Sequence, residues 1–269
     1  MKRSVWDARI QRAQKLSDTY PSARDILRFY VRVAEFQRGL DEQISRAASP
    51  RSEANPAWPA VPDLARLLPA FPSFLDCVAS SAPNPLAEFA AAWKGESSRA
   101  WQESLTRYWS DVNGSALAEN PGELFCARAF LQPYAESLAR ARVVPSDGSA
   151  PRLCPVCGRK PQVGVLRPEG DGGKKSLICS FCATEWEFRR ILCPSCGEGD
   201  EKKQCLYTAE GFPQIRIEAC DTCKTFIECV DMTRDGHAVP LVDEIAAIPP
   251  ALWAAEKGYT KLQPNLLGM

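Results

Sequence analysis

Four Cys-x-x-Cys pairs lie in the second half of this 269-residue chain and contain eight of its twelve cysteines. A Cys-x-x-Cys turn brings two thiolates to one point and directs backbone N–H groups at the sulfurs, and two such turns supply the four tetrahedral ligands that Zn²⁺ or iron accepts. The chain has 21 residues between the first two pairs and 23 between the last two, close to the spacing of metal-binding ribbons. The pattern therefore predicts two metal ions per chain, iron or zinc, each bound by four cysteines.

An internal repeat predicts how the pairs combine. The first pair of each half reads Cys-Pro-x-Cys-Gly, and aligning Cys179 with Cys220 also matches Thr184 with Thr225. A duplicated module of about 40 residues should close its own site in each copy. The predicted metal ligands are Cys154, Cys157, Cys179 and Cys182 in the first module, and Cys193, Cys196, Cys220 and Cys223 in the second.

The residue that follows each pair bears on backbone geometry. Gly158 and Gly197 follow the first pairs and permit the positive φ with which a chain wraps a sulfur. The second pairs have Ala183 and Lys224 at that position, where positive φ would cost strain that the metal bonds must offset.

Disulfides are the weaker alternative for these cysteines. The segment 1–15 is charged and has no apolar stretch typical of an export signal, so the sequence predicts a cytoplasmic protein whose thiols stay reduced. No βαβ pattern surrounds a pair, which disfavours a thioredoxin-like role. No membrane span is expected, because the most apolar stretch, 64–82, contains two prolines and two charged residues.

The remaining cysteines and the single histidine carry no motif. Cys77, Cys126, Cys205 and Cys229 are expected to be small buried residues, and Cys229 aligns with Phe188 in the repeat. His237 lies in a polar loop and is expected to be exposed, which leaves Ser-His-Asp and Cys-His hydrolase chemistry without support. No catalytic residue is predicted.

The predicted fold class is α+β, an all-helical N-terminal domain followed by two small rubredoxin-like or zinc-ribbon modules. In Asp25–Ala47, apolar residues recur every three to four positions, which indicates an amphipathic helix. Further helices are expected at 85–94, 97–112 and 121–142, the last with a kink or break near Leu131 caused by Pro133. The expected parts are a helical domain at 1–142, a linker at 143–151, metal modules at 152–192 and 193–231, and a C-terminal loop with a short helix at 232–269.

Charge disfavours a nucleic-acid partner. The chain has 33 basic and 33 acidic residues, and the stretch 152–231 has 12 of each. Four thiolates around a divalent ion add a net charge of about −2 per site, so the metal region should be acidic, whereas nucleic-acid binding needs a basic surface.

The cysteine region resembles the formate dehydrogenase accessory protein family FdhE. The resemblance rests on the four pairs in order, Thr184-Glu185-Trp186 after the second pair, Asp221 after Cys220, and Glu256-Lys257-Gly258-Tyr259 near the end. It implies a cytoplasmic, non-catalytic factor that binds the catalytic subunit of respiratory formate dehydrogenases and supports its maturation before export. It also implies that the eight paired cysteines bind the metals.

Two other classes of function stay open from the residues alone. One is a nucleic-acid-binding zinc ribbon, and the other is a rubredoxin-like electron carrier, because four thiolates suit zinc and iron equally. If the protein binds a client, the aromatic residues Tyr207, Phe212 and Phe226 are candidates for an exposed client groove. The oligomeric state is not predicted.

Overall fold

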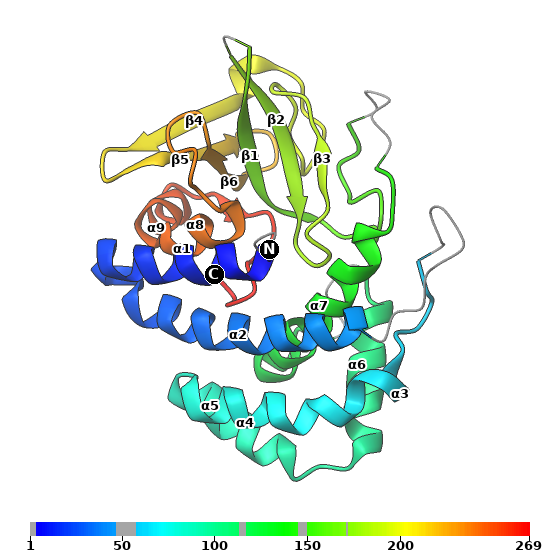
Figure 1. Ribbon diagram of the computed structural model, residues 1–269. Coiled ribbons are helices and arrows are strands. Elements are labelled where there is room, and N and C mark those ends of the chain that lie inside the picture. The colour runs from blue at the N-terminus through cyan, green and yellow to red at the C-terminus, as the bar shows by residue number, and fades with distance from the viewer. Residues whose placement is uncertain (1–3, 47–57, 113–116, 145–149, 171) are drawn as a thin grey trace.

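A mostly helical layer carries a twisted sheet on one side (Figure 1), which confirms the α+β class. The computed structural model describes residues 4–46, 58–112, 117–144, 150–170 and 172–269. The helices of the first half are α1 (Val5–Thr19), α2 (Arg24–Arg46), α3 (Leu64–Leu67), α4 (Phe71–Ser81), α5 (Asn84–Lys94), α6 (Ser98–Ser110) and α7 (Pro121–Arg140), with short 3-10 turns at Pro21–Ala23 and Leu68–Ala70.

Helix α2 follows the predicted stripe. Phe29, Tyr30, Val33, Leu40 and Ile44 are buried, while the arginines between them face outward or only partly inward. The helix lies between α1 and α7 and packs on both (Figure 1). An apolar stripe of this width buries one face against neighbours and leaves the other in water.

Helix α7 is the centre of the helical layer and is buried around nearly its whole circumference from Phe125 to Glu136. It runs unbroken through Pro133, so the break expected near Leu131 does not occur. Contacts from α2, α4, α5 and α6 surround it. Tertiary packing on all sides offsets the hydrogen bond that an internal proline removes.

The strands form one seven-stranded sheet among the described residues. Its members are β1 (Pro161–Glu169), β2 (Gly172–Cys179), β3 (Glu185–Glu187), β4 (Gln204–Ala209), β5 (Phe212–Cys220), β6 (Thr225–Asp231) and β7 (Thr260–Lys261). The order is β3-β2-β1-β6-β5-β4, with β7 beside β6. The parallel pairing of β1 with β6 therefore joins the two predicted modules edge to edge.

The sheet preserves the register of the repeat. In the first copy Leu177 pairs with Trp186, and in the second copy the aligned residues Glu218 and Ile227 pair with each other. Because a slip of one residue would turn every side chain to the opposite face, equal register means equal placement of the cysteines at the strand ends.

The first module shares its hydrophobic core with the helices. Phe181, Trp186 and Phe188 belong to the same buried cluster as Trp109 and Tyr134. A part that shares its core with a neighbour is held in a fixed position relative to it. The domain boundaries stay a prediction, and residues 145–149 of the expected linker lie outside the described part of the chain.

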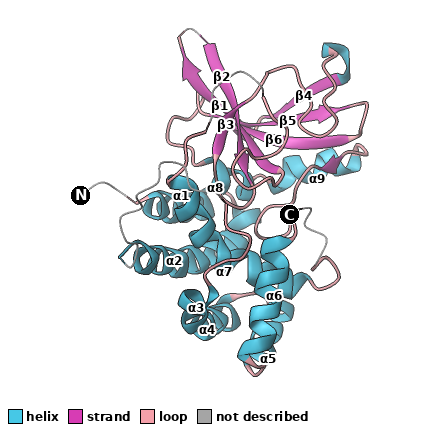
Figure 2. Cartoon of the chain, turned by 90° about the vertical axis from the view of Figure 1, so that its right-hand side faces the viewer, coloured by secondary structure: helices cyan, strands magenta, loops and turns pink. Residues whose placement is uncertain are grey.

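The C-terminal region contains two helices, α8 (Pro240–Ala246) and α9 (Ile248–Glu256), where the sequence predicted a loop and one short helix. Helix α8 lies between α1 on one side and strands β1 and β6 on the other (Figure 2). Seven residues are too few to show a helical period, which explains why the pattern did not reveal it. Beyond β7 the last residues return to helix α7.

No helix in the described ranges is both long and apolar enough to cross a membrane.

Candidate metal centres

The eight paired cysteines form two groups of four, divided as the repeat predicts. The first group is Cys154, Cys157, Cys179 and Cys182, and the second is Cys193, Cys196, Cys220 and Cys223. Within each group the four sulfurs lie within 4.8 Å of one another. All twelve cysteines are free thiols. Each group can therefore hold one metal ion.

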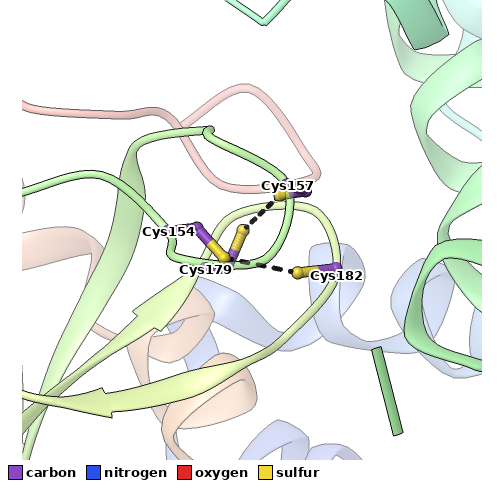
Figure 3. Close-up of side chains that lie close together, drawn as sticks. All are labelled: Cys154, Cys157, Cys179 and Cys182. Atoms are coloured by element: carbon purple, nitrogen blue, oxygen red, sulfur yellow. Dashed lines mark hydrogen bonds between the residues drawn. The ribbon is translucent and has the colours of Figure 1, made fainter. Parts of the chain in front are cut away.

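The first group draws its sulfurs from two loops that face each other (Figure 3). One loop precedes β1 and the other joins β2 to β3. The sulfurs of Cys157 and Cys179 are 3.4 Å apart, and those of Cys154 and Cys182 are 3.6 Å apart. Tetrahedral ligands at about 2.3 Å from a central ion lie about 3.8 Å from one another, so these spacings suit a shared metal rather than a bonded S–S pair at about 2.0 Å.

The second group repeats this geometry. The sulfurs of Cys193 and Cys223 are 3.7 Å apart, and those of Cys196 and Cys220 are 3.8 Å apart. The crossing pattern is the same as in the first group, since the first cysteine of one pair faces the last cysteine of the other. The duplicated sequence thus builds the same site twice.

Backbone and hydroxyl groups point at the sulfurs in both groups. The N–H groups of Val156, Phe181 and Ser195 donate to the first sulfur of their own pair at 3.3–3.4 Å. The hydroxyls of Thr184 and Thr225 lie 3.1 and 3.0 Å from the last sulfur of each group. Donors placed around sulfur stabilise the thiolate and tune a bound metal.

Without a cation, the four thiols of one group titrate unequally. Hydrogen bonds from Cys157, Cys179 and Cys182 lower the pKa of Cys154, whereas hydrogen bonds with Cys154 and Cys157 raise the pKa of Cys182. Burial raises the pKa of Cys179. Four thiolates at contact distance would repel one another, so without a cation some of these cysteines keep their protons. A bound metal ion would replace those protons and offset the repulsion among the thiolates.

The same holds in the second group. Burial raises the pKa of Cys193 to about 12. Burial also acts to raise the pKa of Cys223, but hydrogen bonds led by the Thr225 hydroxyl outweigh it and bring the pKa to about 6.

The two groups differ in what surrounds them. In the first, three cysteines are buried and Cys157 is half-buried, whereas in the second Cys196 is exposed and Cys223 is half-buried. The two copies of the module also differ at the fifth residue after their first cysteine, where Arg159 of the first copy aligns with Glu198 of the second. Arg159 is buried, and Glu198 is half-buried. The first group is therefore closed by protein, and the second is open to solvent.

The backbone around the sulfurs has the conformation that the sequence suggested. Gly158 and Gly197 have φ of 76° and 82°, and Ala183 and Lys224 have φ of 52° and 55°. The two non-glycine residues therefore hold the left-handed conformation that the fold of each second pair requires.

The unpaired residues lie outside both groups. Cys126 and Cys229 are buried, Cys77 and Cys205 are half-buried, and His237 is exposed. Burial raises the pKa of Cys126 and of Cys229, so both remain neutral thiols. The backbone N–H of His237 donates to Asp235, and its ring lies on a surface loop.

The sequence did not reveal the arginines that connect the centres to the rest of the fold. Arg152, just before Cys154, donates from Nη1 to the carbonyl of Ser195 at 2.7 Å. This bond links the first Cys-x-x-Cys turn of one module to the first turn of the other. Arg128 donates from Nη2 to the carbonyl of Ser180, beside Cys179, at 2.9 Å. No local signal marks them, because a lone arginine reads as a surface residue until its partners are known.

The three aromatic residues predicted as candidates for an exposed client groove pack against other side chains or are buried. Phe212 stacks on Tyr20 at 4.5 Å between ring centroids, and Phe226 is buried. Tyr207 packs edge-on against Trp253 at 4.7 Å. The predicted groove at these three residues is therefore not present as an exposed aromatic surface.

These features define an α+β protein with two four-cysteine centres on a shared sheet. Residues 153–190 match the FdhE central domain, and residues 191–267 match the FdhE C-terminal domain. A relative from Pseudomonas aeruginosa, a Protein FdhE homolog, is 30% identical over 216 residues, which cover 78% of this chain and 67% of the relative. The chain belongs to the FdhE family.

Two further likenesses agree with this assignment. A Protein FdhE homolog of Aquifex aeolicus is 32% identical over 141 residues, which cover 52% of this chain and 50% of that relative. The matched region thus spans half of that relative's length. The crystal structure of the FdhE protein from Pseudomonas aeruginosa superimposes with a TM-score of 0.76 at 22% identity over 99% of this chain and 97% of that one. At this identity the superposition shows a common fold.

Proposed function

We propose that this protein is a cytoplasmic, non-catalytic accessory factor that binds the catalytic subunit of a respiratory formate dehydrogenase and supports its maturation before export. Membership of the FdhE family is the observation that carries the proposal. The two centres support it, because a sheet whose two halves are each braced by a four-cysteine metal centre would give a rigid surface on which an incompletely folded client can dock.

The proposal includes the eight paired cysteines as ligands of two metal ions, iron or zinc. Metal analysis of protein purified without oxidant should give about two equivalents per chain. Ferric iron held by four thiolates absorbs visible light and zinc does not, so a spectrum distinguishes the metals. Replacing Cys154 and Cys157 by Ser should remove one equivalent and leave the second group loaded. One equivalent in the unaltered chain would contradict the assignment.

A non-catalytic role agrees with the placement of the only histidine. His237 is exposed on a loop, and its backbone, not its ring, makes the described hydrogen bond. In the described part of the chain its ring makes no hydrogen bond to an acid or nucleophile of the kind that a hydrolase site requires.

Deletion of the gene tests the role in cells. Formate oxidation by the respiratory enzyme should be lost while transcription of that enzyme continues. Unchanged formate oxidation would contradict the proposal.

Capture of the client tests binding directly. Tagged full-length chain should retain the catalytic subunit of the formate dehydrogenase, and the variant with Cys193→Ser and Cys196→Ser should retain less, because the second module loses its metal. His237→Ala is the matched control, since its exposed ring leaves both centres intact. Stronger retention of RNA or DNA than of that subunit at physiological salt would favour the nucleic-acid alternative.

The charges of the metal region give the nucleic-acid alternative little support. Lys174 pairs with Glu187 at 2.8 Å, and Arg167 pairs with Glu185 at 2.7 Å. Basic residues that are already matched by carboxylates do not form the uncompensated positive surface that phosphates need.

Electron transfer is a second candidate function, and the exposure of Cys196 favours it. An iron centre close to solvent can pass one electron to a partner that docks over it. Reversible loss and return of the ferric absorption, at a rate that depends on the second group and not on the first, would support this function.

A further inference from the structure

A cavity of about 700 Å³ lies where the helices, the first metal module and the C-terminal tail meet. Its walls include side chains of α2, α5, α6 and α7, Ser180 directly after β2, and residues 262–268. The apolar lining contains the rings of Phe29, Phe89 and Phe125. This volume and composition are typical of a site for a small organic molecule.

The charged residues of the cavity are all basic. Arg128, Arg159 and Lys160 line it, and no aspartate or glutamate is among its described lining residues. Arg128 and Arg159 are 7% and 6% exposed. Within the described ranges neither forms an ion pair, although buried charges are usually matched by an opposite charge.

The guanidinium of Arg128 is held by neutral oxygens. Its Nη1 donates to the carbonyls of Pro264 and Asn265 at 3.0 and 2.7 Å, and its Nη2 donates to Gln162 Oε1 and to the carbonyl of Ser180, each at 2.9 Å. Burial lowers the pKa of Arg128, and repulsion from Arg159 acts in the same direction. These bonds fix the side chain, but none of them comes from a carboxylate.

Arg159 makes fewer hydrogen bonds than Arg128 among the described residues. Its Nη2 donates to the carbonyls of Tyr108 and Trp109, and its guanidinium lies between the rings of Tyr108 and Phe181, with centroids 4.2 and 4.3 Å away. Its Nε and Nη1 have no hydrogen-bond partner among the residues that the structure describes. Donors without partners on a buried cation at a cavity wall are the groups that an anion would satisfy.

We propose that this cavity binds a small amphiphilic anion, with a carboxylate or phosphate at Arg159 and an apolar body against the rings of Phe29, Phe89 and Phe125. Lys160, exposed at the cavity edge, adds attraction for the anionic group. None of the eight paired cysteines is among the described lining residues, and the site does not depend on the proposed accessory function.

A competing role for the two arginines is to balance the first metal centre. Four thiolates around a divalent ion carry a net charge of −2, and Cys179 is close enough to favour the charged form of Arg128. The two roles make different predictions. Charge balance alone requires metal retention to depend on Arg159, whereas a ligand site requires binding to depend on Arg159, on Lys160 and on the space in the cavity.

Fluorescence titration of the metal-loaded protein with anilinonaphthalenesulfonate, an aromatic anion, tests the proposal. One saturable site is expected, and the uncharged analogue phenylnaphthylamine should bind about tenfold more weakly or worse, because it lacks the charge-assisted hydrogen bonds. Equal binding of both probes would overturn the proposal.

Three variants locate the site. Arg159→Gln and Lys160→Glu should each weaken binding of the anionic probe, and Leu86→Trp should block it by filling the cavity. Lys202→Glu, on the exposed 3-10 turn of the second module, is the matched control and should bind normally. If Arg159→Gln loses metal or fails to fold, the exposed Lys160 and the half-buried Leu86 still decide the outcome. Normal binding by both of those variants would overturn the proposal.

Competition distinguishes the sources of such an anion. Displacement of the probe by decanoate supports a free ligand, and displacement by a Leu-Leu-Phe peptide with a free carboxylate, but not by its amide, supports the end of a polypeptide. Failure of both decanoate and the peptide acid to displace the probe would overturn the proposal.

Discussion

Arg12 of helix α1 donates from Nε to Oδ2 of Asp243 in helix α8 at 2.9 Å, and both side chains are buried. The pair joins the two ends of the chain, which are 231 residues apart in sequence. Nη2 of Arg12 also contacts Asp235 at 2.6 Å. Helix α8 is thereby held between α1 and the sheet, so the N-terminal helix takes part in positioning the metal region.

Arg12→Met should be strongly destabilising. The change leaves the carboxylate of Asp243 buried without its cation, and loss of one partner of a buried pair typically costs about 3–5 kcal/mol. The midpoint of urea unfolding is the measurement. The double variant with Asp243→Asn should recover part of the loss, because it removes the uncompensated charge. Arg99→Ala, whose ion pair with Glu103 is exposed, is the control and should change little. Equal stability of Arg12→Met and the unaltered chain would contradict the assignment.

The cysteine groups were predictable from sequence because their signal is local. Spacing within each pair and the repeat between copies determine which four sulfurs meet, and the equal register of the sheet follows from the same duplication. The apolar stripe of helix α2 was predictable for the same reason, because its signal also lies within one short stretch of sequence.

The contacts that join the two metal modules to each other and to the helical domain were not predictable from local sequence signals. Nothing in β1 or β6 alone indicates that Gly164 pairs with Cys229 in a parallel arrangement. Arg12 and Asp243 are charged, and composition assigns such residues to the surface unless the partner is known. For the same reason the basic cavity around Arg128 and Arg159 had no sequence signal.

The junction of the two modules depends on the absence of a side chain at Gly164. A Cβ at this position would lie 3.3 Å from Cβ and Sγ of Cys229. Gly164→Val should therefore destabilise the protein by about 1–3 kcal/mol through overpacking. Gly211→Ala, in open space, is the control for urea unfolding. Cys229→Ala should partly rescue the valine variant, and no rescue would mean that the clash lies elsewhere.

Glu228 should make stability fall as pH rises. Burial, followed by repulsion from Glu244, raises its pKa to about 8, although Lys261 Nζ lies 2.6 Å away. A carboxyl whose pKa is higher in the folded state contributes stability that is complete below its unfolded value near 4.5 and is lost as pH passes through about 8. Glu228→Gln should remove this loss, so the variant gains stability relative to the unaltered chain between pH 5 and pH 9, both metal-loaded.

The repeat provides the control for this measurement. Glu187 occupies the aligned position in the first module but is exposed, and Lys174 contacts it. Glu187→Gln should leave the pH dependence of unfolding unchanged. A difference between Glu228→Gln and the unaltered chain that does not vary with pH would contradict the raised pKa.

Ala183→Gly should stabilise the protein. Ala183 has φ of 52°, a conformation that costs a residue with a side chain about 1 kcal/mol and costs glycine little. The gain is reduced by the greater freedom of glycine in the unfolded chain, so an increase of about 0.5 kcal/mol is expected. Ala255→Gly, exposed inside helix α9, should instead lower stability by about 1 kcal/mol. A loss of stability in both variants would show that the left-handed conformation at Ala183 carries no strain.

The two centres should release metal at different rates. The first group is enclosed by protein and its loop packs through Phe181 on Trp109, with ring centroids 5.6 Å apart, whereas the second group has the exposed Cys196. A chelator must reach a sulfur-bound ion through an opening, so the second centre should lose its metal first. Variants that keep one centre each, Cys154→Ser with Cys157→Ser and Cys193→Ser with Cys196→Ser, separate the two rates in a chromogenic chelator assay. Faster release from the variant that retains only the first centre would show that burial of these cysteines does not control access to the metal.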